Sequence, residues 1–160
     1  MSDDPQIRTR TFTWHDPLGL ARETHDMSGL RMLCAIRDGE IEPPPITQAL
    51  DFRLAEVEEG RVVWTLTPAE YHYNPIGSVH GGVAATLLDS CMSCAVQTTI
   101  AAGLGYTTLE IKVNMVRPIT EKTGPIRAEG RSLHMGRRSA TAQGWILDTA
   151  GTLLAHASTT

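Results

Sequence analysis

The chain has 160 residues, the length of one domain with a substantial hydrophobic core. Its formal net charge of −4 gives no global reason to expect a nucleic acid or an anionic membrane as partner. Three cysteines do not make a disulfide framework, and residues 1–5 lack the basic and apolar regions of a signal peptide. We therefore expect a cytoplasmic protein built around one main domain.

The first part of the chain has helical rather than strand spacing. Apolar residues recur at helical intervals over residues 28–36, which predicts one short amphipathic helix. Gly39 and the prolines at 43–45 then predict an extended linker. We interpret residues 1–47 as an N-terminal extension and residues 48–160 as the main domain.

The main domain combines strands with one long apolar segment. Alternating apolar residues predict strands at 52–57, 61–67, 107–116, 127–135, 141–148 and 152–158. The segment 82–99 approaches the length of a membrane span but contains several polar residues, so we interpret it as a buried helix. This order predicts an α+β fold in which a long helix covers a largely antiparallel sheet.

The long apolar segment contains one charged residue, Asp89. At 100° per residue its side chain points almost directly away from the apolar stripe that should lie on the sheet. A carboxylate is costly in a buried helix unless something uses it, so Asp89 is a candidate functional residue. The alternative is a solvated helix residue, and spacing alone leaves both interpretations open.

Two glycines, Gly81 and Gly82, begin this helix directly after His80. They either permit a positive φ or let a ligand reach the N–H groups of the helix start, which could bind an oxyanion. His80 is expected to order the loop rather than to act as a base. Gly81 and Asp89 are separated by roughly 12 Å along a helix, whereas a carbonyl and its attacking group lie about 3 Å apart. If both act on one substrate, two antiparallel copies must form the site at a dimer interface.

The pattern Asn74…Gly77…His80-Gly81-Gly82…Asp89 resembles the hotdog-fold acyl-CoA thioesterases, specifically the PaaI-type branch of phenylacetate degradation. The resemblance extends over nearly residues 28–158. It includes the segments 28–30, 38–40, 44–46, 106–110, 116–118, 136–138 and 151–153. It implies a hotdog fold with an N-terminal helical extension, and hydrolysis of an acyl-CoA thioester without a metal or other cofactor.

The resemblance also implies roles for individual residues. Asp89 corresponds to the general base or nucleophile, and the Gly81 backbone N–H to the group that polarises the carbonyl. Asn74 corresponds to a loop amide that holds the carbonyl or the lytic water. Thr108 corresponds to a hydroxyl that orients the water or the carboxylate, and Thr107 competes for this role because the register is uncertain by one residue.

A second group of residues is expected to bind substrate. It comprises His80, Gly82, Ser93, Thr107, Arg117, Arg137 and Arg138. Ser93 lies one turn after Asp89, where a related hotdog branch uses a hydroxyl. The arginines are candidates for the CoA phosphates, because a guanidinium binds phosphate through paired hydrogen bonds, or they are ordinary surface charges. The expected partners are acyl-CoA and further copies of the chain, as a homodimer or a dimer of dimers, with no nucleic acid or membrane.

Two other functions remain open from the sequence. The first is a non-catalytic protein that binds acyl-CoA or an aromatic ligand, because a fold does not determine a function. The second is a hotdog dehydratase or hydratase that pairs His80 with Asp89, although the paired glycines favour the thioesterase pattern. Aryl, short-chain and medium-chain acyl groups are all compatible with the sequence.

Overall fold

The computed structural model describes residues 7–160. Three helices come first: α1 (Pro17–Thr24), α2 (Gly29–Arg37) and α3 (Pro45–Leu50). The strands β1 (Phe52–Glu58) and β2 (Arg61–Leu66) follow, then the 3₁₀ helix η1 (Glu70–His72) and the long helix α4 (Gly81–Gln97). The remaining elements are β3 (Ile111–Met115), the 3₁₀ helix η2 (Glu121–Thr123), β4 (Ile126–Met135), β5 (Ala140–Leu147) and β6 (Leu153–Thr159).

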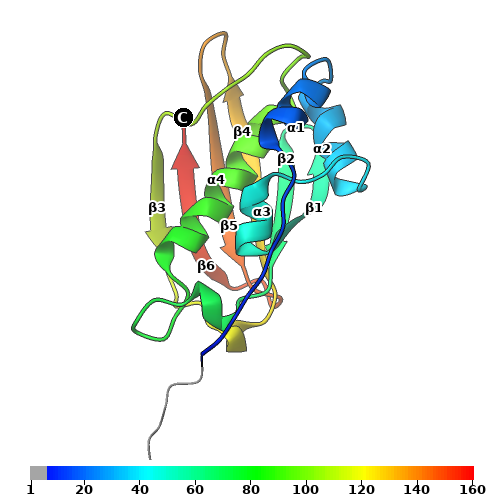
Figure 1. Cartoon of the computed structure of the whole chain (residues 1–160). Coiled ribbons are helices and arrows are strands. Elements are labelled where there is room, and N and C mark those ends of the chain that lie inside the picture. The colour runs from blue at the N-terminus through cyan, green and yellow to red at the C-terminus, as the bar shows by residue number, and fades with distance from the viewer. Residues whose placement is uncertain (1–6) are drawn as a thin grey trace, which may run out of the picture.

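The strands form one antiparallel sheet in the order β1-β2-β4-β5-β6-β3. Helix α4 runs across one face of this sheet, and the three N-terminal helices lie on the same side, beside β1 and β2 (Figure 1). The arrangement confirms the predicted α+β architecture of a long helix on an antiparallel sheet. Among residues 7–160, no helix has the length and apolar character needed to cross a membrane.

Helix α4 lies close to the sheet because two facing strand residues are glycines. Gly130 of β4 and Gly144 of β5 are paired across the ladder. A Cβ at Gly130 would overlap the carbonyl group of Cys91, and one at Gly144 would lie 2.8 Å from Cγ of Met92. Around this contact the α4 side chains are fully buried, as Leu88 illustrates with 0% exposure. The close approach fixes the position of α4, and with it the position of any functional group that the helix carries.

The region before β1 differs from the predicted extended linker. The last proline of the run, Pro45, is the first residue of α3. Proline is favoured at this position because its missing N–H would have no helical partner and its φ is already helical. The helix ends at Leu50, and its C-cap Asp51 has a φ of 53°. The boundary predicted between residues 47 and 48 therefore falls inside α3.

Strand β3 is shorter than the predicted strand at 107–116. The N–H groups of Leu109 and Glu110 both donate to the carbonyl of Thr160, so the ladder is irregular before Ile111. The segment from 107 to 110 is consequently a loop that connects α4 to the edge of the sheet. This matters for the site, because Thr107 and Thr108 lie in this loop.

Candidate functional site

The start of α4 is a corner organised by hydrogen bonds between near neighbours. His80 is the N-cap, and its Nδ1 accepts the N–H of Gly82 at 2.9 Å. A Cβ at position 82 would lie 2.9 Å from the same nitrogen, so a larger residue would push the imidazole out of its present capping position. His80 thus orders the corner, and the Gly82 N–H is already bonded to its imidazole.

The N–H of Gly81 differs from that of Gly82. It has no hydrogen-bond partner within residues 7–160, as is usual for the first residue of a helix. A Cβ at this position would approach only Cε of Met115, at 3.4 Å. Gly81 lines a cavity of about 370 Å³, which we call the corner cavity and which is also lined by Asn74 and Arg117. The Gly81 N–H is therefore a donor without a partner beside an open cavity.

Asn74 shapes the loop that precedes this corner. Its Oδ1 accepts the N–H groups of Ile76 at 3.1 Å and Ser78 at 3.4 Å. Its Nδ2 donates to the hydroxyl of Ser78 at 3.3 Å. An amide nitrogen has two hydrogens, so one N–H of Asn74 remains for a ligand in the corner cavity.

Asp89 lies in the middle of α4 and is half-buried. Its Oδ1 accepts the hydroxyl of Thr108 at 2.9 Å. Thr107 makes no such contact and is exposed. Of the two threonines between which the sequence did not decide, the structure thus brings Thr108 to the carboxylate.

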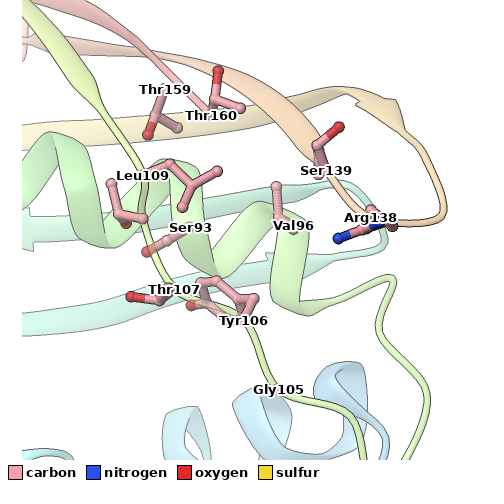
Figure 2. Close-up of a pocket in the computed structure, with 12 residues that line it drawn as sticks. Ser93, Val96, Gly105, Tyr106, Thr107, Leu109, Arg138, Ser139, Thr159 and Thr160 are labelled. Carbon is pink, nitrogen blue, oxygen red and sulfur yellow. The ribbon is translucent and has the colours of Figure 1, made fainter.

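A second cavity, of about 230 Å³, is lined by Thr108 and Ser93, which both hydrogen-bond to Asp89, although Asp89 itself does not line it; we call it the carboxylate cavity. Figure 2 shows that its walls come from α4, from the loop after α4, from the turn between β4 and β5 and from the C-terminal end of β6. The lining residues include Ser93, Val96, Tyr106, Thr107, Thr108, Leu109 and Arg138. The hydroxyl of Ser93 donates to the backbone carbonyl of Asp89 at 2.6 Å, so helix backbone already occupies its hydrogen.

The three candidate arginines are divided between the two cavities. Arg138 lines the carboxylate cavity, and Arg137 lines a space adjoining it beyond Val96. Arg117 lines the corner cavity, where it also donates to the carbonyl of Leu153 at 2.6 Å. The arginines therefore lie beside both ends of the candidate site.

Tyr106 is a residue of the carboxylate cavity that the sequence analysis did not single out as functional. Tyr106 is 44% exposed as a residue, but the protein atoms around its hydroxyl desolvate that group and raise its pKa; the nearby Cys94 and Asp89 act in the same direction, whereas the hydroxyl of Ser93 opposes them. Tyr106 therefore stays protonated and able to donate a hydrogen bond. No sequence signal marks this role, because a tyrosine in a loop is ordinary.

The two cavities do not meet within one copy of the chain. Gly81 and Asp89 lie on one continuous helix, roughly 12 Å apart along its axis. The corner cavity and the carboxylate cavity have no lining residue in common. Within residues 7–160 there is also no group of three histidine, cysteine or acidic residues that could hold a metal ion.

Comparison with known proteins gives the following similarities. The model of the Thioesterase superfamily matches residues 76–155. A solved structure of a protein from this superfamily is 30% identical over 82% of this chain and 95% of its own, with a TM-score of 0.67. A phenylacetic acid degradation-related putative thioesterase from Ralstonia eutropha JMP134 is 24% identical over 79% and 96%, with a TM-score of 0.72. The PaaI protein of E. coli is 20% identical over 82% and 93%, with a TM-score of 0.69. No curated protein sequence matches.

Proposed function

This chain belongs to the thioesterase superfamily, and we propose that it hydrolyses acyl-CoA thioesters to the free acid and CoA. Its sheet and long helix form the hotdog fold that the PaaI-type resemblance implied, a fold shared with the PaaI protein of E. coli. The observation that carries the proposal is the half-buried Asp89 with a hydroxyl donor on one oxygen, on the same helix as an unpaired Gly81 N–H.

In the proposed reaction, the carboxylate of Asp89 either removes a proton from water or attacks the thioester carbonyl itself. The hydrogen bond from Thr108 occupies Oδ1 and leaves Oδ2 to act. Attack on the carbonyl carbon produces an oxyanion, which the Gly81 N–H stabilises. The C–S bond then breaks and CoA leaves as a thiolate, which needs little help as a leaving group. Where Asp89 is the nucleophile, water hydrolyses the resulting anhydride.

We further propose that the complete site forms between two copies of the chain. The distance between Gly81 and Asp89 within one copy is too long for one carbonyl to meet both. Strand β3 is an edge of the sheet, and apolar residues lie exposed along it, including Ile111 and Met115. A second copy related by a two-fold axis would cover this edge and bring each Gly81 corner to the partner's carboxylate.

The acyl group and the CoA would then occupy different parts of this composite site. Val96, Tyr106 and Leu109 give the carboxylate cavity an apolar wall for the acyl group, with the hydroxyls of Ser93 and Thr107 beside it. The free amide hydrogen of Asn74 would hold the carbonyl or the lytic water. Arg117, Arg137 and Arg138 would bind the phosphates, as would be expected of guanidinium groups around a nucleotide.

A hydrolysis screen tests this function. The chain is mixed with benzoyl-, phenylacetyl-, hydroxyphenylacetyl- and C4–C16 acyl-CoA in the presence of a thiol reagent that detects free CoA. We expect at least one ester to be turned over, and we expect an Asp89→Ala variant with unchanged thermal stability to be inactive. If esters bind and persist, the protein is a binding module, and the hydrolytic proposal is wrong.

A further inference from the structure

His72 is a buried histidine that the proposed chemistry does not use. It is the last residue of η1 and is 2% exposed. Its Nε2 lies 2.9 Å from the carbonyl oxygen of Leu50, at the end of α3. Its Nδ1 accepts the backbone N–H of Ala69 at 3.0 Å. Both ring nitrogens are thus bonded to backbone groups from two different segments.

These two contacts are compatible with one protonation state of the ring. A carbonyl oxygen can only accept, so Nε2 must carry a hydrogen, and a backbone N–H can only donate, so Nδ1 must present its lone pair. Protonation of Nδ1 would set two donors against each other. Burial accordingly lowers the pKa of His72 below its ordinary value of 6.5. The hydrogen bond to the Leu50 carbonyl raises the pKa of His72. Of the charged neighbours, Arg10 lowers this pKa and Asp51 raises it.

The backbone of His72 continues directly to the corner at the start of α4. Its carbonyl oxygen accepts the N–H of His80 at 2.8 Å. His80 in turn caps α4 through Gly82 and immediately precedes Gly81. The position of the His72 ring and the position of the Gly81 N–H are therefore linked through the backbone of a single residue, His80.

A segment far away in the sequence covers this histidine. The guanidinium of Arg10, in the strap formed by residues 7–16, donates to the carbonyls of Gln48 at 2.9 Å and Ala49 at 2.6 Å. It also lies 4.2 Å from the ring centroid of Tyr71, whose ring is 4.2 Å from that of His72. The strap runs beside α3 in Figure 1. It thus packs outside the Tyr71–His72 pair and ties it to the end of α3.

We propose that His72 is a positioning residue that holds the Gly81 corner in its reactive geometry, and that it does so only as the neutral Nε2–H tautomer. The consequence for catalysis rests on the proposed function, because it assumes that the corner binds the thioester carbonyl. The tautomer and its link to the corner do not, and can be measured without substrate.

The pH dependence follows from the direction of the pKa shift. A histidine whose pKa is lowered in the folded protein contributes stability that is complete above its unfolded value of 6.5. This contribution is lost as the pH falls through the lowered pKa. We therefore expect the corner to loosen on the acid side of 6.5 and not at neutral or alkaline pH.

The test compares two substitutions. In His72→Gln the amide can still donate to Leu50 but does not titrate, whereas His72→Phe keeps a ring and removes both hydrogen bonds. With phenylacetyl-CoA we expect His72→Phe to lower kcat about tenfold to hundredfold, with KM nearly unchanged, because the corner is displaced. We expect His72→Gln to recover most of this loss and to lack the wild-type decline on the acid side that titrates with His72. His156→Gln, on β6, is the matched control and should leave kcat and the pH profile unchanged.

An NMR titration of the ¹⁵N-labelled chain provides a readout that is independent of activity and of any unfolding of the variants. We expect His72 to give the Nε2–H pattern at neutral pH, and the amide signals of Gly81 and Gly82 to shift with the midpoint of its titration. The proposal is overturned by an Nδ1–H or charged ring at neutral pH, by glycine signals that ignore the titration, or by wild-type kcat in His72→Phe. Absence of any hydrolysis in the wild-type chain contradicts the proposed function instead and leaves the NMR test to decide this proposal.

Discussion

The two halves of the proposed site are organised in different ways. The corner at the start of α4 depends on contacts between residues close in sequence, such as the bond from Gly82 to His80, and it presents a backbone N–H. The carboxylate depends on a contact between residues 19 apart, Asp89 and Thr108, and it presents a side chain. Apart from His80 and His72, whose side chains hold its backbone in place, the corner is therefore less sensitive to side-chain changes than to backbone changes, and the reverse holds at Asp89.

The largest effect is expected at the side chain of the carboxylate half. Asp89→Asn keeps the size of the side chain and its contact with Thr108 but removes the charge that accepts the proton. Loss of a general base typically costs up to about 10⁴-fold, and we expect kcat to fall about a thousandfold. Steady-state hydrolysis of the best substrate measures this, with circular dichroism as the control for folding. A kcat within tenfold of the wild type would mean that Asp89 is not the reacting group.

The next largest effect is expected from a backbone change at the corner. Gly81→Pro removes the N–H at the first position of α4, where proline is favoured in a helix. His80 precedes it with φ −60° and ψ 135°, a conformation that suits a residue before proline. We expect kcat to fall about a hundredfold, the usual cost of one oxyanion donor. Gly81→Ala is the matched control, since it adds a Cβ and keeps the N–H, and it should retain most of the activity. Equal losses in the two variants would indicate a steric effect rather than a lost donor.

A smaller effect is expected at the residue that orients the carboxylate. Thr108→Val removes the hydroxyl donated to Oδ1 of Asp89 and preserves the shape of the side chain. We expect kcat to fall about tenfold, because the carboxylate loses its fixed orientation. Thr108→Ser should retain activity, and Thr107→Val should have little effect. A larger loss at Thr107 than at Thr108 would contradict the register seen in the structure.

The smallest effect is expected at Tyr106. Tyr106→Phe removes a hydroxyl that stays protonated in the carboxylate cavity and keeps the apolar wall. We expect kcat with unsubstituted acyl groups to change by less than about threefold, which is the scale of one modest hydrogen bond. Comparison of phenylacetyl- with hydroxyphenylacetyl-CoA would show whether the hydroxyl selects polar acyl groups. A loss as large as that of Asp89→Asn would place Tyr106 in the chemistry itself.

The sequence predicts most of the fold because its signals are local. Strand alternation and the single long apolar segment define the sheet and α4, and the glycines after His80 define the start of that helix. The sequence does not predict α3, because the prolines that suggest a linker also suit the start of a helix. The packing of an irregular loop against α4 decides which of Thr107 and Thr108 meets Asp89. The same packing places Tyr106 beside Ser93. No local pattern records such long-range packing.

The central claim is that one substrate meets Gly81 of one copy and Asp89 of another, and mixed dimers test it most directly. A chain with Gly81→Pro and a chain with Asp89→Asn, each nearly inactive alone, are given different affinity tags, and their mixed dimer is purified. One of its two sites then combines an intact Gly81 with an intact Asp89, so the account predicts about half of the wild-type kcat per dimer. A mixed dimer as inactive as its parents would contradict the account.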